Sequence, residues 1–397
     1  MNSLNYFFRY LVQYSNFYNK TLPKESNLYI DASYLYNFQS ACYNLISKKN
    51  HKYFIDPETH KFQYGGNRKF YLKYLDYFEE FDDLFNKERI INLEFFKDDN
   101  NFEDFYKKII RFQRTMLAKT HIPLDFYKAI ANGKEKINKF NPLENLEFYI
   151  SPYFEFYNIE NQYYNLTLKY SLVNPDNYSV LRFPKEILSK IKNINKIFQD
   201  FKNIKGILIN ILYLDEYDKK DLNLYFENLI ELIYRFSSNG QKVILMSNSE
   251  FGKYFKYFGL DSVCSNVMIG QISEEYKPFK TNSKGGSSDF LYIPEIERSI
   301  SITNAETLIE RNKNIDRFSE VNIRELNLDS RTENYYQSIK KKVNKINKSP
   351  IQVIIEELQN SFDKIKYKLH KNKYKYLIIW KALLFKKVNE YFGDFNK

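Results

Sequence analysis

Two short segments of the sequence end in an aspartate that could take part in acid–base chemistry. Each segment is an apolar run with strand-forming character, at residues 27–31 and 53–56. In α/β proteins, the carboxyl end of a buried strand is where catalytic groups are usually found. Two carboxylates on neighbouring strands can serve as nucleophile and general acid or base at a glycosidic bond. We therefore predict Asp31 and Asp56 as a catalytic pair.

Each aspartate also has a purely structural interpretation. Asp31 is followed by Ala-Ser, so its side chain could cap a helix that starts there. Asp56 opens the run Asp-Pro-Glu-Thr, which is ordinary turn sequence. The sequence leaves both interpretations open beside the catalytic one.

Strand-like runs alternate with helix-length amphipathic stretches along most of the chain, a pattern typical of a parallel sheet. The clearest part runs from residue 206 to 269, where Asn239-Gly240 and Gly259 mark the helix ends. Eight strands in about 300 residues favour a (β/α)8 barrel over an open sheet. The predicted strands cover residues 28–31, 53–56, 147–151, 165–170, 206–214, 242–246, 262–269 and 290–294.

The charge distribution divides the chain into a body and a tail. Of the net charge of +11, residues 333–397 carry +9, from 15 Lys against six Asp and Glu. Apolar residues recur at helical spacing around 351–369 and 376–388, so the tail should form two helices. We predict a barrel-like body at 1–332, with a helical insertion at about 64–146, and a basic α-helical extension at 333–397.

The lysines of the tail could contact a phosphate backbone, because neutralising phosphates is the main source of nucleic-acid affinity. The alternative is a solvated lysine-rich surface with no ligand. The residues proposed for backbone contact are Lys341, Lys342, Lys345, Lys366, Lys368, Lys371 and Lys373.

Further polar residues fall at the predicted strand ends and in one loop. His60 lies four residues after Asp56 and could act as an acid or base or bind substrate, although a lone histidine is more often structural. The only Gly/Ser-rich stretch, at 280–288 with Lys284, could cradle a phosphate or form a lid. The other strand-end candidates are Ser151, Lys169, Asp215, Glu216, Ser247, Asn248, Gln271 and Glu295, of which Asp215, Asn248 and Gln271 are predicted to bind substrate. For several of these, a helix cap or a solvated loop is the simpler explanation.

The composition argues against several classes of protein. The two cysteines and four histidines show no metal-site spacing, so we expect neither a metal nor a cofactor. No signal peptide or spanning segment is evident, because the apolar run at 376–385 is short and contains Lys381. We expect a cytoplasmic protein that has no membrane partner.

Three features together resemble the tRNA-guanine transglycosylase superfamily and its DNA-directed relatives. They are the barrel pattern, Asp56 ahead of Phe62-Gln63 and Gly65-Gly66, and a late Gly259-Leu260 followed by Gly270-Gln271. Gln271 stands where the family has a glutamate, and the family's zinc cluster and Asp-x-x-x-Pro-Thr-Arg segment have no counterpart. The resemblance implies a (β/α)8 barrel, with Gln63 among the substrate-binding residues. It also implies action on the bond between a base and its sugar, with an aspartate attacking or stabilising the sugar.

The leading hypothesis is therefore an enzyme that cleaves or exchanges a base at an N-glycosidic bond in DNA or RNA. The alternative is a non-catalytic nucleic-acid-binding subunit of a larger complex, built on a degenerate barrel. An enzyme for a sugar or phosphate metabolite is a third hypothesis, because one fold supports many reactions.

Overall fold

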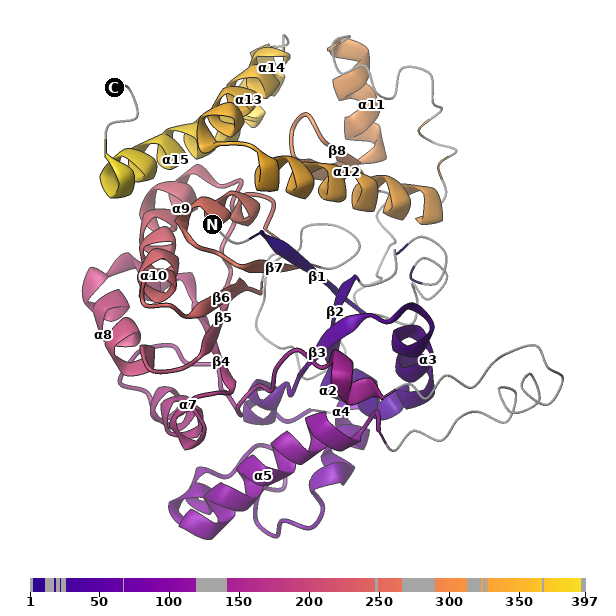
Figure 1. Ribbon diagram of the computed structural model, residues 1–397, viewed down its shortest axis with the longest axis vertical. Helices are drawn as coiled ribbons and strands as arrows, with labels where there is room; N and C mark the ends of the chain where they lie inside the picture. Colours follow the sequence, from indigo (N-terminus) through magenta and orange to yellow (C-terminus); the bar gives the residue numbers. More distant parts are fainter. Residues whose placement is uncertain are drawn as a thin grey trace, which may run out of the picture.

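The architecture comes from a computed structural model of the 397-residue chain (Figure 1). It describes residues 3–10, 18, 22, 26–66, 68–118, 141–246, 249–265, 290–312, 323, 326, 328–365 and 368–393.

Within these ranges the centre of the molecule is a curled sheet of seven parallel strands (Figure 1). Their order across the sheet is β3-β2-β1-β7-β6-β5-β4, so the first strand in sequence lies in the middle. The strands are β1 Asn5–Arg9, β2 Asn27–Asp31, β3 Lys52–Asp56, β4 Tyr178–Pro184, β5 Gly206–Leu212, β6 Lys242–Leu245 and β7 Ser262–Ser265.

Helices surround this sheet and continue into the C-terminal part of the chain. On the body they are α2 Ala32–Asn37, α3 Gln39–Lys49, α4 Lys69–Leu75, α5 Asp99–Thr115, α7 Gln162–Val173, α8 Ile191–Phe201, α9 Lys219–Leu224 and α10 Phe226–Ser238. Two short 3-10 helices matter for the site, η2 Thr59–Gln63 and η7 Gly252–Phe258. The C-terminal helices are α11 Ile302–Arg311, α12 Leu328–Lys348, α13 Ile351–Asp363, α14 Lys368–Lys373 and α15 Tyr376–Phe392.

The two faces of the sheet carry separate apolar cores. Successive side chains of a strand point to opposite faces. On β5, Leu208 belongs to an inner cluster, while Ile207, Ile209 and Ile211 pack in the outer core that includes Ile194 of α8. The inner cluster draws on every strand of the sheet, with Phe7, Tyr29, Phe54, Val180, Leu208, Ile244 and Cys264. Side chains from all seven strands can meet only if the sheet curls around them.

The two edge strands, β3 and β4, are connected by residues 146–155. Single parallel bridges pair Leu146 with Tyr53, Ile150 with Tyr178 and Glu155 with Arg182. The segment at 147–151 was predicted as a strand, but only these isolated bridges form there. The structure thus shows a parallel sheet whose edges are bridged.

Two other strand predictions were wrong. Residues 165–170 lie within α7, where Asn161 caps the helix and Tyr164, Thr167 and Tyr170 are buried at helical spacing. Residues 290–294 begin β8 (Phe290–Ile293), which pairs antiparallel with β9 (Arg298–Ser301) in a separate two-stranded sheet. Neither segment therefore supplies a parallel strand of the central sheet.

Two strands of the sheet were not predicted. Neither β1 nor β4 has the bounded, uniformly aliphatic pattern of β5. In β1 the aromatic run ends at Arg9, and in β4 an arginine and a proline interrupt the apolar residues. The strands predicted at 28–31, 53–56, 206–214, 242–246 and 262–269 correspond to β2, β3, β5, β6 and β7, although β5 ends at Leu212 and residues 266–269 lie outside the described residues.

The predicted tail helices are confirmed as α13 and α15. They pack into the same outer core as the body, and the indole of Trp380 stacks on Phe251 with ring centroids 4.7 Å apart. Helix α12 runs alongside β1, with Tyr336 against Phe8 and the amide of Asn347 bonded to the backbone of Leu4. Its C-terminal end therefore lies at the amino end of β1.

Candidate active site

Asp31 and Asp56 lie directly opposite each other at the carboxyl ends of β2 and β3. They are register partners in the parallel ladder. Each follows by two residues a member of the inner cluster, Tyr29 and Phe54, so both side chains belong to the concave face. Both residues are only 6% exposed. The structure thus brings the two predicted carboxylates together.

Asp31 is held by an arginine from the next strand. It occupies the N-cap position of α2, but its side chain makes no capping hydrogen bond within the described helix. Instead, Arg9 Nε donates to Asp31 Oδ2 at 2.9 Å, and the guanidinium forms an ion pair with the carboxylate. Burial opposes the charge on Arg9, but Asp31 and Tyr29 outweigh it and raise the Arg9 pKa. The capping interpretation was therefore wrong, and Asp31 instead forms an ion pair with Arg9.

Asp56 has a different environment. Its Oδ1 accepts hydrogen bonds from the Glu58 backbone N–H at 2.9 Å and from the Tyr153 hydroxyl at 2.7 Å. The turn interpretation was thus correct for the local backbone. Burial, followed by the nearby charges of Glu58 and Asp31, raises the pKa of Asp56 to about 7. Asp56 can therefore keep its proton close to neutral pH.

Glu58 is a third buried carboxylate beside this pair, and sequence reasoning missed it. Its Oε2 accepts from the backbone N–H of Ser33 at 2.9 Å and from the Ser33 hydroxyl, and Lys61 forms an ion pair with Oε1. Glu58 also has a left-handed backbone, with φ of 52°. These contacts tie the loop after β3 to the start of α2, which fixes the positions of Asp31 and Asp56.

A second buried ion pair lies toward β4. Together with Arg9, Asp31, Asp56 and Glu58 it forms a buried polar layer. Arg182 Nε donates to Glu155 Oε2 at 2.7 Å, and the hydroxyl groups of Tyr64 and Tyr157 donate to Glu155 Oε1. Sequence reasoning missed both members of this pair. The pattern that could have found Arg182 is its place near the end of a strand, two residues after the inner residue Val180.

His60 and Gln63, both predicted to bind substrate, lie next to this layer. The amide of Gln63 pairs with both backbone groups of Glu155, at 2.8 and 2.6 Å, so its observed role is structural. The His60 ring stacks on Tyr153 with centroids 5.3 Å apart. Burial, then the charges of Arg182, Lys61 and Arg9, holds the His60 pKa well below its usual value. Arg9 and Arg182 come from β1 and β4, whose residues Phe7 and Val180 meet in the inner cluster.

The remaining strand-end candidates lie elsewhere. Asp215 accepts from Tyr217 N in a local turn, and Lys169 lies on α7, 3.3 Å from Asp99. Glu216 is buried and accepts hydrogen bonds from Ser249 and from the backbone N–H groups of residues 250 and 251, while burial raises its pKa to about 7. Glu295 lies between β8 and β9, away from the parallel sheet. The predicted residues Ser247, Asn248, Gln271 and Lys284 fall outside the described residues.

The predicted backbone-contact lysines have varied environments. Lys342 pairs with Glu297 at 2.8 Å and with Glu357 at 3.1 Å, and Lys345 pairs with Glu357 at 2.7 Å. These two are held by acidic partners of the chain itself, and Lys342 is largely buried. Lys341 is exposed, Lys371 and Lys373 lie over the rings of Phe362 and Tyr374, and Lys366 and the side chain of Lys368 are outside the described part.

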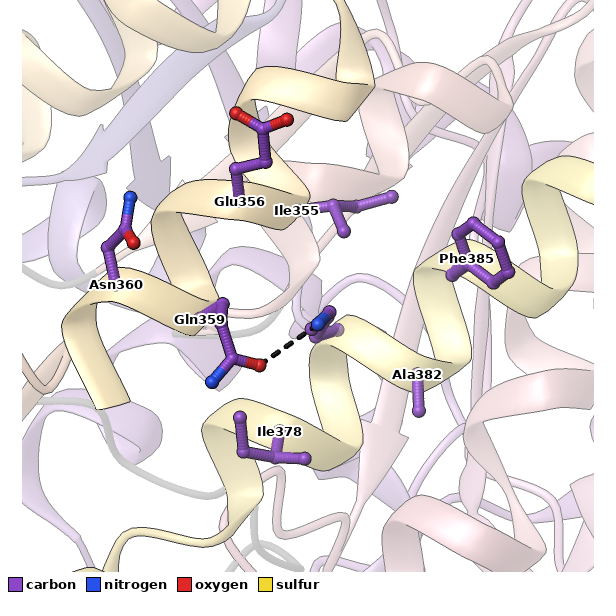
Figure 2. Close-up of a pocket in the computed structure, with 8 residues that line it drawn as sticks. Ile355, Glu356, Gln359, Asn360, Ile378, Ala382 and Phe385 are labelled. Carbon is purple, nitrogen blue, oxygen red and sulfur yellow. Dashed lines mark hydrogen bonds between the residues drawn. The ribbon is translucent and has the colours of Figure 1, made fainter. Parts of the chain in front are cut away.

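Two cavities are formed away from the aspartate pair. The larger, of about 590 Å³, is a groove between α13 and α15 lined by Ile355, Ile378, Ala382 and Phe385, and Gln359 accepts a hydrogen bond from Lys381 beside it (Figure 2). The smaller, of about 290 Å³, lies near residues 237–242 and 256–261.

Comparison with protein-family models, curated proteins and solved structures gives no match. Among the described residues, no helix is long and apolar enough to cross a membrane. The same residues contain no group of three or more His, Cys, Asp or Glu side chains that could hold a metal ion.

Proposed function

We propose that this protein cleaves or exchanges a base at an N-glycosidic bond in nucleic acid, with Asp31 and Asp56 as the catalytic residues. One observation carries the proposal. Two register-paired carboxylates lie in contrasting environments, because Asp31 forms an ion pair with the Arg9 guanidinium, whereas burial and neighbouring carboxylates raise the pKa of Asp56 to about 7. Pairs whose environments separate their pKa values are typical of acid–base catalysis at glycosidic bonds.

In the proposed reaction, protonated Asp56 acts as the general acid. It donates its proton to a ring nitrogen of the leaving base as the bond between that base and C1′ of the sugar breaks. The Asp31 carboxylate stabilises the positive charge that develops on the sugar, or attacks C1′ directly. Water or an incoming base then adds at C1′ and returns a proton to the Asp56 carboxylate.

The spacing of the pair favours direct attack by Asp31. Adjacent strands lie about 4.8 Å apart. Retaining glycosidases separate their two carboxyl groups by about 5 Å, whereas inverting enzymes leave roughly 6.5–9.5 Å for a water molecule. A reaction that retains the configuration at C1′ is therefore expected.

A closed eight-stranded barrel is part of the same proposal. Residues 146–155 occupy the position between β3 and β4 that an eighth strand would fill, with bridges to both. In such a barrel, the strand ends that carry Arg9, Asp31, Asp56 and Arg182 surround one opening.

The basic tail favours a polymeric substrate. The exposed residues Lys340, Lys341 and Lys348 lie on α12, whose C-terminal end is bonded to the amino end of β1. A polymeric substrate is long enough to contact these lysines and, at the same time, the aspartates at the carboxyl ends of β2 and β3.

The non-catalytic alternative has its own supporting observation. Arg9 and Arg182 are each bound to a carboxylate of the chain, and Asp56 is held by Tyr153. A polar layer so fully paired is also what a purely structural site would show. In that case the protein would bind nucleic acid through its tail and release no base.

Conservative variants of the two aspartates separate these functions. We expect Asp56→Asn and Asp31→Asn to lower base release from modified and unmodified DNA and RNA by at least about 100-fold, while binding to the same oligonucleotides is retained. Asp104→Asn, an exposed aspartate on α5, is the matched control and should behave as wild type. Binding by the wild-type protein without release from any of these substrates would refute the enzyme and leave the binding protein.

A further inference from the structure

Helix α15 presents apolar residues on both of its sides. One side is buried in the outer core, with Trp380 and Leu384. The other side carries Ile378, Ala382 and Phe385, which share a face at helical spacing and are at least partly exposed. A helix that is apolar all round is normally buried on all sides. The outer side of α15 therefore lacks a covering element among the described residues.

This outer side forms one wall of the groove of about 590 Å³, and α13 forms the other wall (Figure 2). The volume is within the range of ligand sites, about 300–1,000 Å³. The exposed lining is mainly apolar, and Phe385 is 41% exposed. The amide at its centre is already paired, because Gln359 accepts from Lys381 at 2.9 Å and donates to Asp363 at 2.9 Å. The groove therefore suits an occupant with apolar side chains.

One end of the groove is basic. The bond between Lys381 and Gln359 places the end of α13 beside the start of α15. Lys364 follows α13, and Lys373 and Lys375 precede α15, so all three lie toward this end. Their side chains are exposed, and no ion pair among the described residues of the tail includes them. An occupant with acidic residues at this end would therefore be attracted.

The same features argue against other occupants. A second copy of the chain would bring together two tails that each carry +9 at residues 333–397. Glu356 lines the groove, and its carboxylate would repel the phosphates of nucleic acid or of an anionic membrane. A membrane-binding helix also needs apolar side chains that protrude into the lipid, whereas a groove receives the side chains of its partner.

We propose that the groove between α13 and α15 binds an amphipathic helix of a partner protein, with the acidic end of that helix against Lys364, Lys373 and Lys375. Helices that bind in grooves use apolar anchors spaced i, i+3 or i+4 and i+7. The wall from Ile378 to Phe385 spans two helical turns, about 10 Å, which matches such a set of anchors. The groove shares no residue with the aspartate pair, so this interaction is independent of the proposed function.

Three designed peptides test the apolar and the charged parts of the groove separately. The acidic peptide is a helix of about 15 residues, with a leucine stripe along one face and glutamates in its first turns. The neutral peptide has Gln in place of each Glu, and the scrambled peptide keeps the acidic composition without the stripe. We expect the 397-residue protein to bind the acidic peptide at least about 10-fold more tightly than the scrambled one, as measured by fluorescence anisotropy.

Two variants test whether the peptide lies in the groove. Ala382→Glu introduces a charged, helix-forming side chain at an exposed position, so the protein should fold and should bind the acidic and neutral peptides at least about 10-fold more weakly. Phe385→Gln removes an apolar part of the wall and should weaken both in the same direction. Leu172→Gln, which replaces a 48% exposed leucine of α7, is the matched control and should leave binding unchanged.

Substitution of the three lysines at the basic end to Gln tests the charge of the partner. This triple variant should bind the acidic peptide about 3- to 10-fold more weakly and the neutral peptide as well as wild type does. Substituting Lys107, Lys169 and Lys192 to Gln removes the same charge from another surface and should change neither affinity, because salt screens distant charges.

Several results would overturn the proposal. These are equal binding of the acidic and scrambled peptides, equal effects of Ala382→Glu and Leu172→Gln, and equal effects of the two lysine triples. A wild-type dimer in sedimentation that Ala382→Glu dissociates would assign the groove to a second copy instead. Binding to phosphatidylserine vesicles or to duplex DNA that Ala382→Glu abolishes would assign it to a membrane or to nucleic acid, and would equally exclude a partner helix.

Discussion

At the scale of single residues, the two aspartates differ because their neighbours differ. Asp31 has a cation from β1 as its partner, whereas Asp56 has a phenol and two other carboxylates nearby. A charge without a cationic partner is costly in a buried site, so Asp56 favours its protonated form. The difference between the two sites therefore follows from the partners, because the aspartates themselves are chemically equal.

The Tyr153 hydroxyl tunes this acid. Its hydrogen bond stabilises the charged form of Asp56 and lowers the Asp56 pKa, against the larger effect of burial. We expect Tyr153→Phe to raise the Asp56 pKa above its value of about 7, because the phenylalanine ring still stacks on His60 but donates no hydrogen bond. Isotope-edited infrared spectroscopy of the aspartate carboxyl groups measures this titration directly.

The same variant makes a prediction for catalysis. Because the proposed reaction uses the acid form of Asp56, base release should decline as pH rises through about 7 in wild type, and the decline should move to higher pH in Tyr153→Phe. Tyr157→Phe, which alters a hydroxyl bound to Glu155, is the matched control and should leave the decline in place. A shift of the infrared titration or of the rate profile to lower pH would contradict the role given to Tyr153.

At the scale of elements, side chains form hydrogen bonds with the backbone of residues 146–155, where a regular strand would pair with the backbone of its neighbouring strands. The Gln113 amide pairs with both backbone groups of Ile150, at 2.9 and 2.7 Å. Gln63 does the same for Glu155, and the Thr59 hydroxyl does so for Tyr153. A side-chain amide can mimic a strand because it carries one donor and one acceptor side in the same arrangement as a peptide group.

Because the Gln113 side chain takes the place of a neighbouring strand, we predict that replacing this buried glutamine lowers stability by an unusually large amount. Gln113→Leu leaves the N–H and the C=O of Ile150 without partners in a buried site, so it should lower the free energy of unfolding by about 2–5 kcal/mol. Denaturant titration measures the change. Gln162→Leu, at an exposed position of α7, is the control and should change stability by less than about 0.5 kcal/mol. Equal effects of the two substitutions would mean that Gln113 does not hold this segment.

At the scale of the whole molecule, the tail is part of the folded core. Trp380 is fully buried, and its indole donates to the backbone oxygen of Glu216 at 2.9 Å. Buried charges add to this attachment, because Lys253 and Lys342 lie among Glu250, Glu297 and Glu357. Deleting the tail would expose this surface, so its role in binding is better tested by substitutions on its exposed side.

The exposed lysines of α12 provide that test. We expect the triple substitution of Lys340, Lys341 and Lys348 to Gln to reduce the slope of log affinity against log salt by about 0.9 for each lost phosphate contact on duplex DNA. Substituting Lys107, Lys169 and Lys192, which are exposed on α5, α7 and α8, removes the same charge from another surface. If both triples change the slope equally, the tail has no specific role and only net charge matters.

The sequence by itself determined the elements whose pattern is local. The aliphatic run of β5, the amphipathic periods of α13 and α15, and the aspartates that end β2 and β3 could all be predicted, because each depends on residues a few positions apart. The mixed aromatic pattern of α7 did not indicate a helix. The local pattern of β8 and β9 also did not show that their hairpin forms a sheet separate from the parallel one.

Only the tertiary structure decided what these residues can do together. Arg9 reaches Asp31 across the neighbouring strands β1 and β2, and Tyr153 and Arg182 reach Asp56 and Glu155 because residues 146–155 bridge β3 and β4. The charge of a carboxylate depends on such partners and on burial, and neither is a property of nearby sequence. The sequence thus placed two aspartates at strand ends, and the fold gave one of them a cationic partner and buried the other beside carboxylates.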